Sequence, residues 1–156
     1  FIVFFKGLNN FKSYIPKENL GKQIHTFNSK IFLSNEEINF DMLLKDHEFY
    51  ILNIWASWCA PCRQEHKFLM ELSKISSIKI IGLNYKDDLD NAKNFIDKYG
   101  NPYSDILIDE YGIISIELGA YGVPETFIID KNKRILKKFV GALNKDSLKE
   151  IIFLTK

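Results

Sequence analysis

The chain has 156 residues, of which 46% are hydrophobic and 14% aromatic, enough for one globular domain with its own core. Its 21 basic and 20 acidic residues give a formal net charge of +1, which argues against a nucleic-acid-binding protein or a polybasic membrane-surface protein. The sequence contains no repeat and no low-complexity segment.

The N-terminus combines an apolar run with a polar stretch, FIVFF followed by KGLNNFKSYIPKENLGK. A run this short cannot cross a bilayer, which takes about 20 residues in a helix. It is either an N-terminal strand or frayed apolar end, or the tail of a signal or membrane anchor. We treat residues 1–21 as an N-terminal segment and residues 22–156 as one domain, since no linker divides the latter.

From residue 22 onward, apolar runs alternate with amphipathic stretches. The runs predict strands, and the longest are typical of strands buried in a central sheet. Spacings of three and four between apolar residues predict the main helices. In chain order, the predicted elements are one or two strands in Gln23–Leu33, a strand at Phe49–Ala56, a helix from the cysteines through Ile75, a strand at Ile78–Tyr85, a helix over Leu89–Tyr99, a strand at Ser104–Glu110, one or two helical turns in Glu110–Gly122, a strand at Glu125–Asp130, its hairpin partner at Arg134–Gly141, and a last helix capped by Asn144.

This order of elements predicts an α/β fold, with a central mixed β-sheet and helices on both of its faces. The β–α–β part favours parallel strands, whereas the final hairpin adds antiparallel ones. The strands in Gln23–Leu33 would extend the sheet from its N-terminal side.

Cys59 and Cys62 are the only cysteines of the chain, and they stand in the segment NIWASWCAPCRQEH. Such a pair can be a redox dithiol, half of a zinc site, a haem attachment point or a coincidence. Zinc needs about four ligands, and the chain offers only three histidines and no second pair at zinc spacing. A haem attachment point needs histidine directly after the second cysteine, where Arg63 stands. The pattern therefore favours a redox dithiol, and we predict no metal.

The place of the pair along the chain supports this interpretation. A buried strand is expected to end at Ala56, so Cys59 would lie at a helix N-terminus, where free N–H groups and the helix dipole stabilise a thiolate. Pro61 suits the first helical turn, because a missing N–H costs little there. We therefore assign Cys59 as the nucleophile and Cys62, one turn further and less exposed, as the resolving cysteine.

The segments WASWCAPC and GVPETF together resemble the thioredoxin superfamily. More specifically, LNIWASWCAPCRQEH, GLNYKDD, GNPYSDILIDEYG, LGAYGVPETFIID and VGALN are similar, in order and spacing over about residues 20–145, to the cytochrome c maturation thioredoxins called CcmG or DsbE. The resemblance implies a thioredoxin-like fold and a periplasmic location, with an N-terminal helix as anchor in the bacterial inner membrane. It favours the interpretation of FIVFF as the end of that anchor.

The resemblance also implies roles for residues around the dithiol. Pro124 matches a cis-proline that faces the dithiol in the family, and the backbone of Val123 would then pair with an extended substrate segment. Glu65 and Glu125 match acidic positions of the family. Because a nearby carboxylate disfavours a thiolate, both are expected to raise the pKa of the Cys59 thiol.

Further residues near the motif carry weaker signals. Asn53 stands where thioredoxins proper have a buried aspartate, as it does in the family, and it cannot take up a proton. Trp58 directly precedes Cys59 and is expected to shield the dithiol and to offer an apolar contact to the substrate. Asp87 and Asp88 follow a predicted strand, so each either shapes a substrate groove, as the resemblance implies, or caps a helix.

These features predict a thiol-disulfide oxidoreductase that acts as a periplasmic reductant in cytochrome c maturation. Its substrate would be a disulfide of apocytochrome c or of a partner maturation thiol protein, since haem can be joined only to free thiols and the periplasm is oxidising. A membrane thiol reductant of the CcdA or DsbD type would supply the electrons. No cofactor beyond the redox-active disulfide Cys59–Cys62 is predicted, and neither nucleic acid nor, apart from the anchor, a membrane is an expected partner. Two alternatives remain: a protein of the same fold that is a general periplasmic thioredoxin of the TlpA or ResA type or an oxidant, and a module that binds apocytochrome without turnover.

Overall fold

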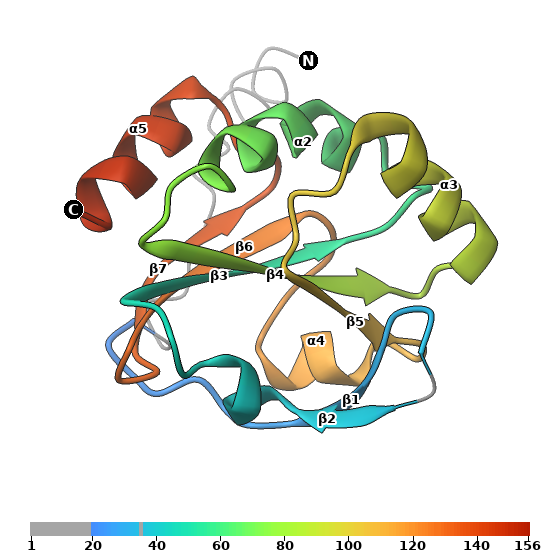
Figure 1. Cartoon of the computed structure of the whole chain (residues 1–156), viewed down its shortest axis with the longest axis horizontal. Coiled ribbons are helices and arrows are strands. Elements are labelled where there is room, and N and C mark those ends of the chain that lie inside the picture. Colours follow the sequence, from blue (N-terminus) through green and yellow to red (C-terminus); the bar gives the residue numbers. More distant parts are fainter. Residues whose placement is uncertain (1–19, 35) are drawn as a thin grey trace, which may run out of the picture.

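The structure, a computed structural model, describes residues 20–34 and 36–156. These residues form a seven-stranded sheet in the order β2-β1-β5-β4-β3-β6-β7, with helices on both faces (Figure 1). The predicted α/β fold with a mixed sheet is therefore confirmed. The predicted anchor and linker, residues 1–21, lies outside the described residues except for its last two.

The elements follow one another as the sequence predicts, with two short additions near the N-terminal end. Their bounds are β1 (Asn28–Ile31), β2 (Glu37–Asn39), the 3₁₀ helix η2 (Phe40–Leu43), β3 (Phe49–Trp55), α2 (Ala60–Leu72), β4 (Ile78–Tyr85), α3 (Leu89–Tyr99), β5 (Asp105–Asp109), α4 (Ile113–Glu117), β6 (Glu125–Asp130), β7 (Ile135–Val140) and α5 (Lys145–Leu154).

The sheet is mixed because of the way the central strand pairs. β3 runs parallel to β4 and antiparallel to β6, while β5 runs parallel to β4 and β7 antiparallel to β6. The predicted N-terminal extension is β1, which joins the sheet antiparallel to β5 and carries β2 at its outer edge. None of the helices in residues 20–34 and 36–156 is both long and apolar enough to span a bilayer.

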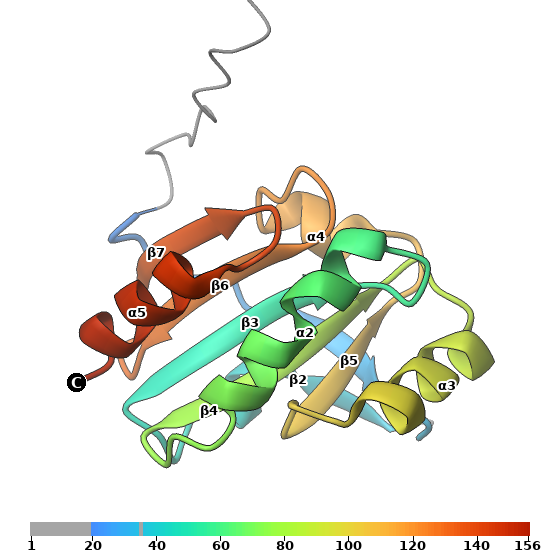
Figure 2. The same cartoon turned by 90° about the horizontal axis from the view of Figure 1, so that it is seen from above.

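Two hydrophobic cores lie on the two faces of the sheet. α2, α3 and α5 cover one face, and α4 with η2 covers the other (Figures 1 and 2). Successive side chains of a strand point to opposite faces, so β3 serves both cores: Ile51 and Trp55 face α2, whereas Leu52 and Ile54 face α4. Asn53 lies between Ile51 and Trp55 on the α2 face, and it is fully buried there.

Three local predictions differ from the structure. β2 and η2 were not predicted, because three-residue and four-residue elements are too short to show a period. α2 ends at Leu72, and Ile75 packs against the core from the turn that follows. On α3, whose predicted apolar positions are Leu89, Ala92, Ile96 and Tyr99, the buried residues are Ala92 and Phe95, while Leu89 is 41% exposed because it lies at the start of the helix.

Candidate active site

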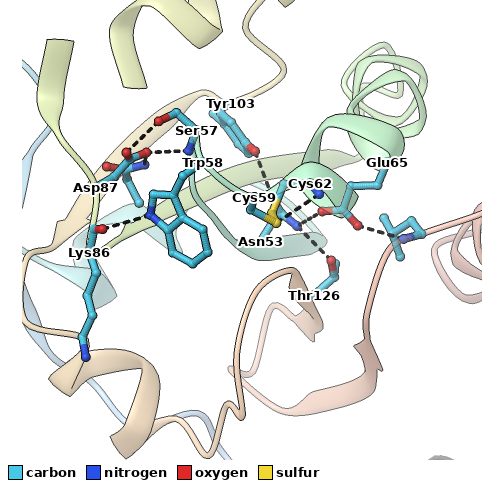
Figure 3. Close-up of a disulfide and its surroundings, with 12 residues drawn as sticks. Asn53, Ser57, Trp58, Cys59, Cys62, Glu65, Lys86, Asp87, Tyr103 and Thr126 are labelled. Atoms are coloured by element: carbon cyan, nitrogen blue, oxygen red, sulfur yellow. Dashed lines mark hydrogen bonds between the residues drawn. A yellow bond between two sulfur atoms is a disulfide. The ribbon is translucent and has the colours of Figure 1, made fainter. Parts of the chain in front are cut away.

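The two cysteines lie where β3 gives way to α2 and are joined by a disulfide (Figure 3). Cys59 is the N-cap residue of α2, with an extended backbone (φ −85°, ψ 109°). Its Sγ accepts a hydrogen bond from the backbone N–H of Cys62 at 3.1 Å. Pro61 occupies the first turn, where its missing N–H costs nothing. The helix start predicted at the cysteines is confirmed.

The cap position favours charge on the sulfur of Cys59. A sulfur that accepts a helix N–H lies at the positive end of the helix dipole, and both effects stabilise a thiolate there once the disulfide is reduced. Exposure does not separate the two cysteines, since Cys59 is 3% and Cys62 2% exposed. The assignment of Cys59 as the nucleophile thus rests on the cap geometry and stays a prediction.

The loop before the dithiol is fastened by Asp87. The carboxylate of Asp87 accepts hydrogen bonds from the backbone N–H of Ser57 at 2.6 Å and from its hydroxyl at 2.7 Å. Asp88 instead caps α3 through the N–H of Asn91. Asp88 thus has the predicted capping role, and Asp87 holds the loop beside the dithiol. The role of this acidic pair in shaping a substrate groove stays a prediction.

Trp58 lies on the surface beside the dithiol (Figure 3). Its side chain is 58% exposed, and its indole N–H donates to the backbone carbonyl of Lys86 at 3.0 Å. This single bond fixes the ring while leaving most of it open to a partner. The place of Trp58 is compatible with the predicted apolar contact to substrate, which stays a prediction.

Glu65 is a buried carboxylate on the inner face of α2, three residues after Cys62. Its Oε1 accepts a hydrogen bond from the side-chain amide of Asn53 at 2.8 Å, and its Oε2 accepts from the backbone N–H of Leu143 at 2.8 Å. Burial raises the pKa of Glu65 from 4.5 to about 7, while the two hydrogen bonds oppose the shift. Glu65 can therefore gain or lose a proton near neutral pH.

Tyr103 and Thr126 complete the polar cluster around Glu65, and sequence reasoning missed both. The hydroxyl of Tyr103 donates to Asn53 Oδ1 at 2.9 Å, so the Asn53 amide nitrogen must face Glu65 and the Thr126 hydroxyl, which lies 3.0 Å away. Burial, followed by the charge of Glu65, raises the pKa of Tyr103 far above its ordinary value, so this hydroxyl remains a donor. The cluster orients Asn53, and through it Glu65, beside the dithiol (Figure 3).

Glu125 lies on the other face of the sheet. It is paired in register with Ile54, whose side chain faces α4, while Glu65 packs on the α2 face. Glu125 is 1% exposed, and its Oε2 lies 2.8 Å from the ammonium of Lys138, which is 5% exposed. The two predicted acidic residues thus do not form one cluster, because a sheet lies between them and a cation neutralises only Glu125.

The Val123–Pro124 peptide bond is cis, as the resemblance implies. Val123 precedes β6, which begins at Glu125. Within residues 20–34 and 36–156, neither the N–H nor the carbonyl of Val123 has a backbone hydrogen-bond partner. This backbone can accept a further extended segment, so the pairing role predicted for Val123 is stereochemically open.

The described residues also bear on metal binding. Within residues 20–34 and 36–156, no three or more His, Cys, Asp or Glu side chains are grouped to hold a metal ion. His66, which follows the dithiol on α2, is 4% exposed, and its Nε2 lies 2.9 Å from the carbonyl oxygen of Gly100. Its ring packs edge-on against Phe95, so His66 is a packing residue.

Comparison with known proteins gives one family and a consistent set of relatives. The model of the Redoxin family matches residues 20–152. The thiol:disulfide interchange protein DsbE of Vibrio cholerae is 43% identical over 113 residues, 72% of this chain and 61% of the relative. CycY of Rhizobium leguminosarum bv. viciae, also named a thiol:disulfide interchange protein, is 46% identical over 64% of this chain and 54% of its own length. A probable DsbE-2 of Pasteurella multocida is 36% identical over 96% of this chain and 78% of its own. In the first two matches the chain thus spans little more than half of the curated relative.

Solved structures give the same fold. A putative thiol:disulfide interchange protein DsbE from Chlorobium tepidum has a TM-score of 0.74 at 22% identity, over 87% of this chain and 96% of the other. The thioredoxin domain of a thiol-disulfide oxidoreductase from Bacteroides vulgatus has a TM-score of 0.73 at 14% identity, over 88% and 98%. These likenesses confirm the predicted thioredoxin-like fold.

Proposed function

This chain belongs to the Redoxin family, and from that premise we propose that it is a thiol-disulfide oxidoreductase that acts as a periplasmic reductant in cytochrome c maturation. The observation that carries the proposal is the sulfur of Cys59 at the N-cap of α2, bonded to the N–H of Cys62. The likeness to thiol:disulfide interchange proteins supports the activity. The five motifs shared with the cytochrome c maturation thioredoxins support the narrower role.

The reaction proceeds by two exchanges. In the reduced protein, the Cys59 thiolate attacks one sulfur of a substrate disulfide, so that a mixed disulfide forms and the other substrate sulfur leaves as a thiolate. Cys62, deprotonated, then attacks the Cys59 sulfur, which releases the second substrate thiolate and closes the Cys59–Cys62 disulfide. Two electrons pass to the substrate, and a membrane thiol reductant of the CcdA or DsbD type restores the dithiol.

Other residues around the dithiol serve in proton transfer and in substrate binding. Glu65, one turn after Cys62 and titrating near neutral pH, restrains the thiolate by its charge and exchanges a proton with the site. Trp58 offers an exposed ring, and the backbone of Val123 pairs with the substrate segment as an added strand. The substrate is the disulfide of an apocytochrome c haem-binding segment or of a partner maturation thiol protein.

A peptide that carries Cys-x-x-Cys-His as an internal disulfide tests this function. The reduced protein is expected to reduce it stoichiometrically, as followed by thiol titration and mass spectrometry. The matched control peptide has alanine in place of histidine, and the matched control protein is Cys59→Ser. Equal rates on both peptides and on unrelated disulfides would point to a general thioredoxin of the TlpA or ResA type. Binding without reduction would point to a non-turnover module.

A further inference from the structure

The segment Gly119–Gly122, which leads into the Val123–Pro124 bond, is held by the buried ion pair between Glu125 and Lys138. One oxygen of Glu125 accepts the backbone N–H groups of Tyr121 at 2.6 Å and Gly122 at 3.2 Å. Its other oxygen lies 2.8 Å from the ammonium of Lys138. The pair thus connects the start of β6 to the loop before it.

Lys138 holds the same segment a second time. Its ammonium donates to the carbonyl of Gly119 at 2.7 Å, and the ring of Tyr121 covers it at 4.5 Å from the ring centroid. Tyr121 is 67% exposed, so its ring separates a buried cation from solvent. A buried cation with one carboxylate and one carbonyl as partners has little freedom to move, because every displacement leaves a charge unpaired.

We propose that Lys138 is a positioning residue for partner recognition, which fixes the loop Gly119–Val123 so that the backbone of Val123 is ready to pair with an extended substrate. This rests on the proposed function and deepens it. Lys138 does not touch the dithiol in this arrangement, since its partners are Gly119, Tyr121, Glu125 and the Phe127 ring. It should therefore affect the binding of long substrates and leave the thiol chemistry unchanged.

Lys138→Met keeps the length of the aliphatic stem and removes the ammonium. With an extended disulfide peptide, KM is expected to rise about tenfold at nearly constant kcat, because the two charge-assisted hydrogen bonds that order the loop are lost. With hydroxyethyl disulfide, a substrate too small to pair with Val123, the rate is expected to stay within about twofold of the parent. Lys138→Arg, which keeps a cation, is expected to retain most of the affinity.

The matched control is Lys137→Met on the same strand. Lys137 forms a half-exposed ion pair with Glu150 on α5, away from the loop. Removing its ammonium should change neither the KM for the peptide nor the rate with hydroxyethyl disulfide. If Lys138→Met leaves Glu125 as an unpaired buried charge and does not fold, the double variant Lys138→Met/Glu125→Gln removes both charges, and it should show the same rise in KM.

Amide hydrogen exchange at Tyr121 and Gly122 gives a readout that needs no activity. It is expected to speed up at least tenfold in Lys138→Met and to stay unchanged in Lys137→Met, since only the former loses the anchor. An unchanged peptide KM with unchanged exchange overturns the inference, as does an equal slowing of both substrates, which indicates a general structural role. If the parent protein reduces neither disulfide, the proposed function fails, and the exchange data alone decide the loop anchor.

Discussion

Replacing Cys62 with serine is expected to arrest the reaction at the mixed disulfide. The remaining Cys59 thiolate can still attack a substrate disulfide, but no second thiol is present to resolve the adduct. Multiple turnover should fall by roughly 10³-fold or more, as when one member of a catalytic unit is removed. Mass spectrometry under non-reducing conditions should then find the protein joined to one substrate molecule through Cys59.

The reciprocal variant provides the control. Cys59→Ser should form no stable adduct, because Cys62 lies inside the first turn of α2 and donates its N–H to the cap position instead of occupying it. Accumulation of a Cys62 adduct in this variant, at a rate similar to that of the Cys62→Ser protein, would reverse the assignment of the nucleophile.

Replacing Glu65 with glutamine is expected to change how folding stability depends on pH. Burial raises the pKa of Glu65 from 4.5 in an unfolded chain to about 7 in the folded protein. Between these values the folded protein binds a proton that the unfolded chain does not, so the stabilisation is complete below pH 4.5, falls as pH rises, and is gone above pH 7. At about 1.4 kcal/mol per pKa unit, the free energy of unfolding loses about 3 kcal/mol across this window.

Urea unfolding of the oxidised protein across this range measures the effect. Between pH 4.5 and pH 7, the free energy of unfolding of Glu65→Gln should fall by about 3 kcal/mol less than that of the parent, because the glutamine side chain does not titrate. Glu71→Gln, an exposed change on the same helix, should behave like the parent. Parallel stability curves for Glu65→Gln and the parent would show that folding does not raise the pKa of Glu65.

The same variant should also change the thiol. Removing the negative charge of Glu65 favours the Cys59 thiolate, so the pKa of the Cys59 thiol should fall and the couple should become more oxidising. Glu125→Gln should do less, because Lys138 already neutralises the Glu125 charge on the far face of the sheet. Ultraviolet thiolate absorbance against pH distinguishes the two. Equal shifts would contradict the separation of the two carboxylates.

The parts of the site that sequence reasoning found are local in the chain. The dithiol, Pro61 and the helix start follow from a strand that ends four residues before Cys59 and from the capping chemistry at that point. Pro124 was found through the family resemblance carried by the motif GVPETF. β3, β4 and β6 were predicted nearly to the residue, because buried strands are continuous apolar runs between turn signals.

The parts that were missed depend on register between distant segments. Tyr103 and Thr126 both form hydrogen bonds with Asn53, from which they lie 50 and 73 residues away in the sequence. No single segment of the sequence carries that information. Glu65 itself was predicted as a site residue, and its burial, which was not predicted, did leave a signal: it shares the spacing of four and three with Leu69 and Leu72 on the buried face of α2.

Lys138 could not be placed from its own strand. Strict alternation from Ile135 would point Lys138 to the opposite face, towards α5. A β-bulge between Ile128 and Ile129 shifts the register, so Ile135 and Lys138 both face α4. That irregularity brings the cation to Glu125, and a sequence pattern of period two does not contain it.

The equilibrium reduction potential of the Cys59–Cys62 couple against glutathione tests most directly whether this protein is a reductant. A maturation reductant should lie nearer thioredoxin, at about −270 mV, than DsbA, at about −120 mV. Glu65 lies beside the dithiol and is partly ionised at neutral pH. Its charge argues for a reduction potential near that of thioredoxin, because it disfavours the kind of stabilised thiolate that makes DsbA oxidising. A value near −270 mV is the predicted result, and a value near −120 mV would contradict the account, because electrons would then flow from substrate thiols to this protein.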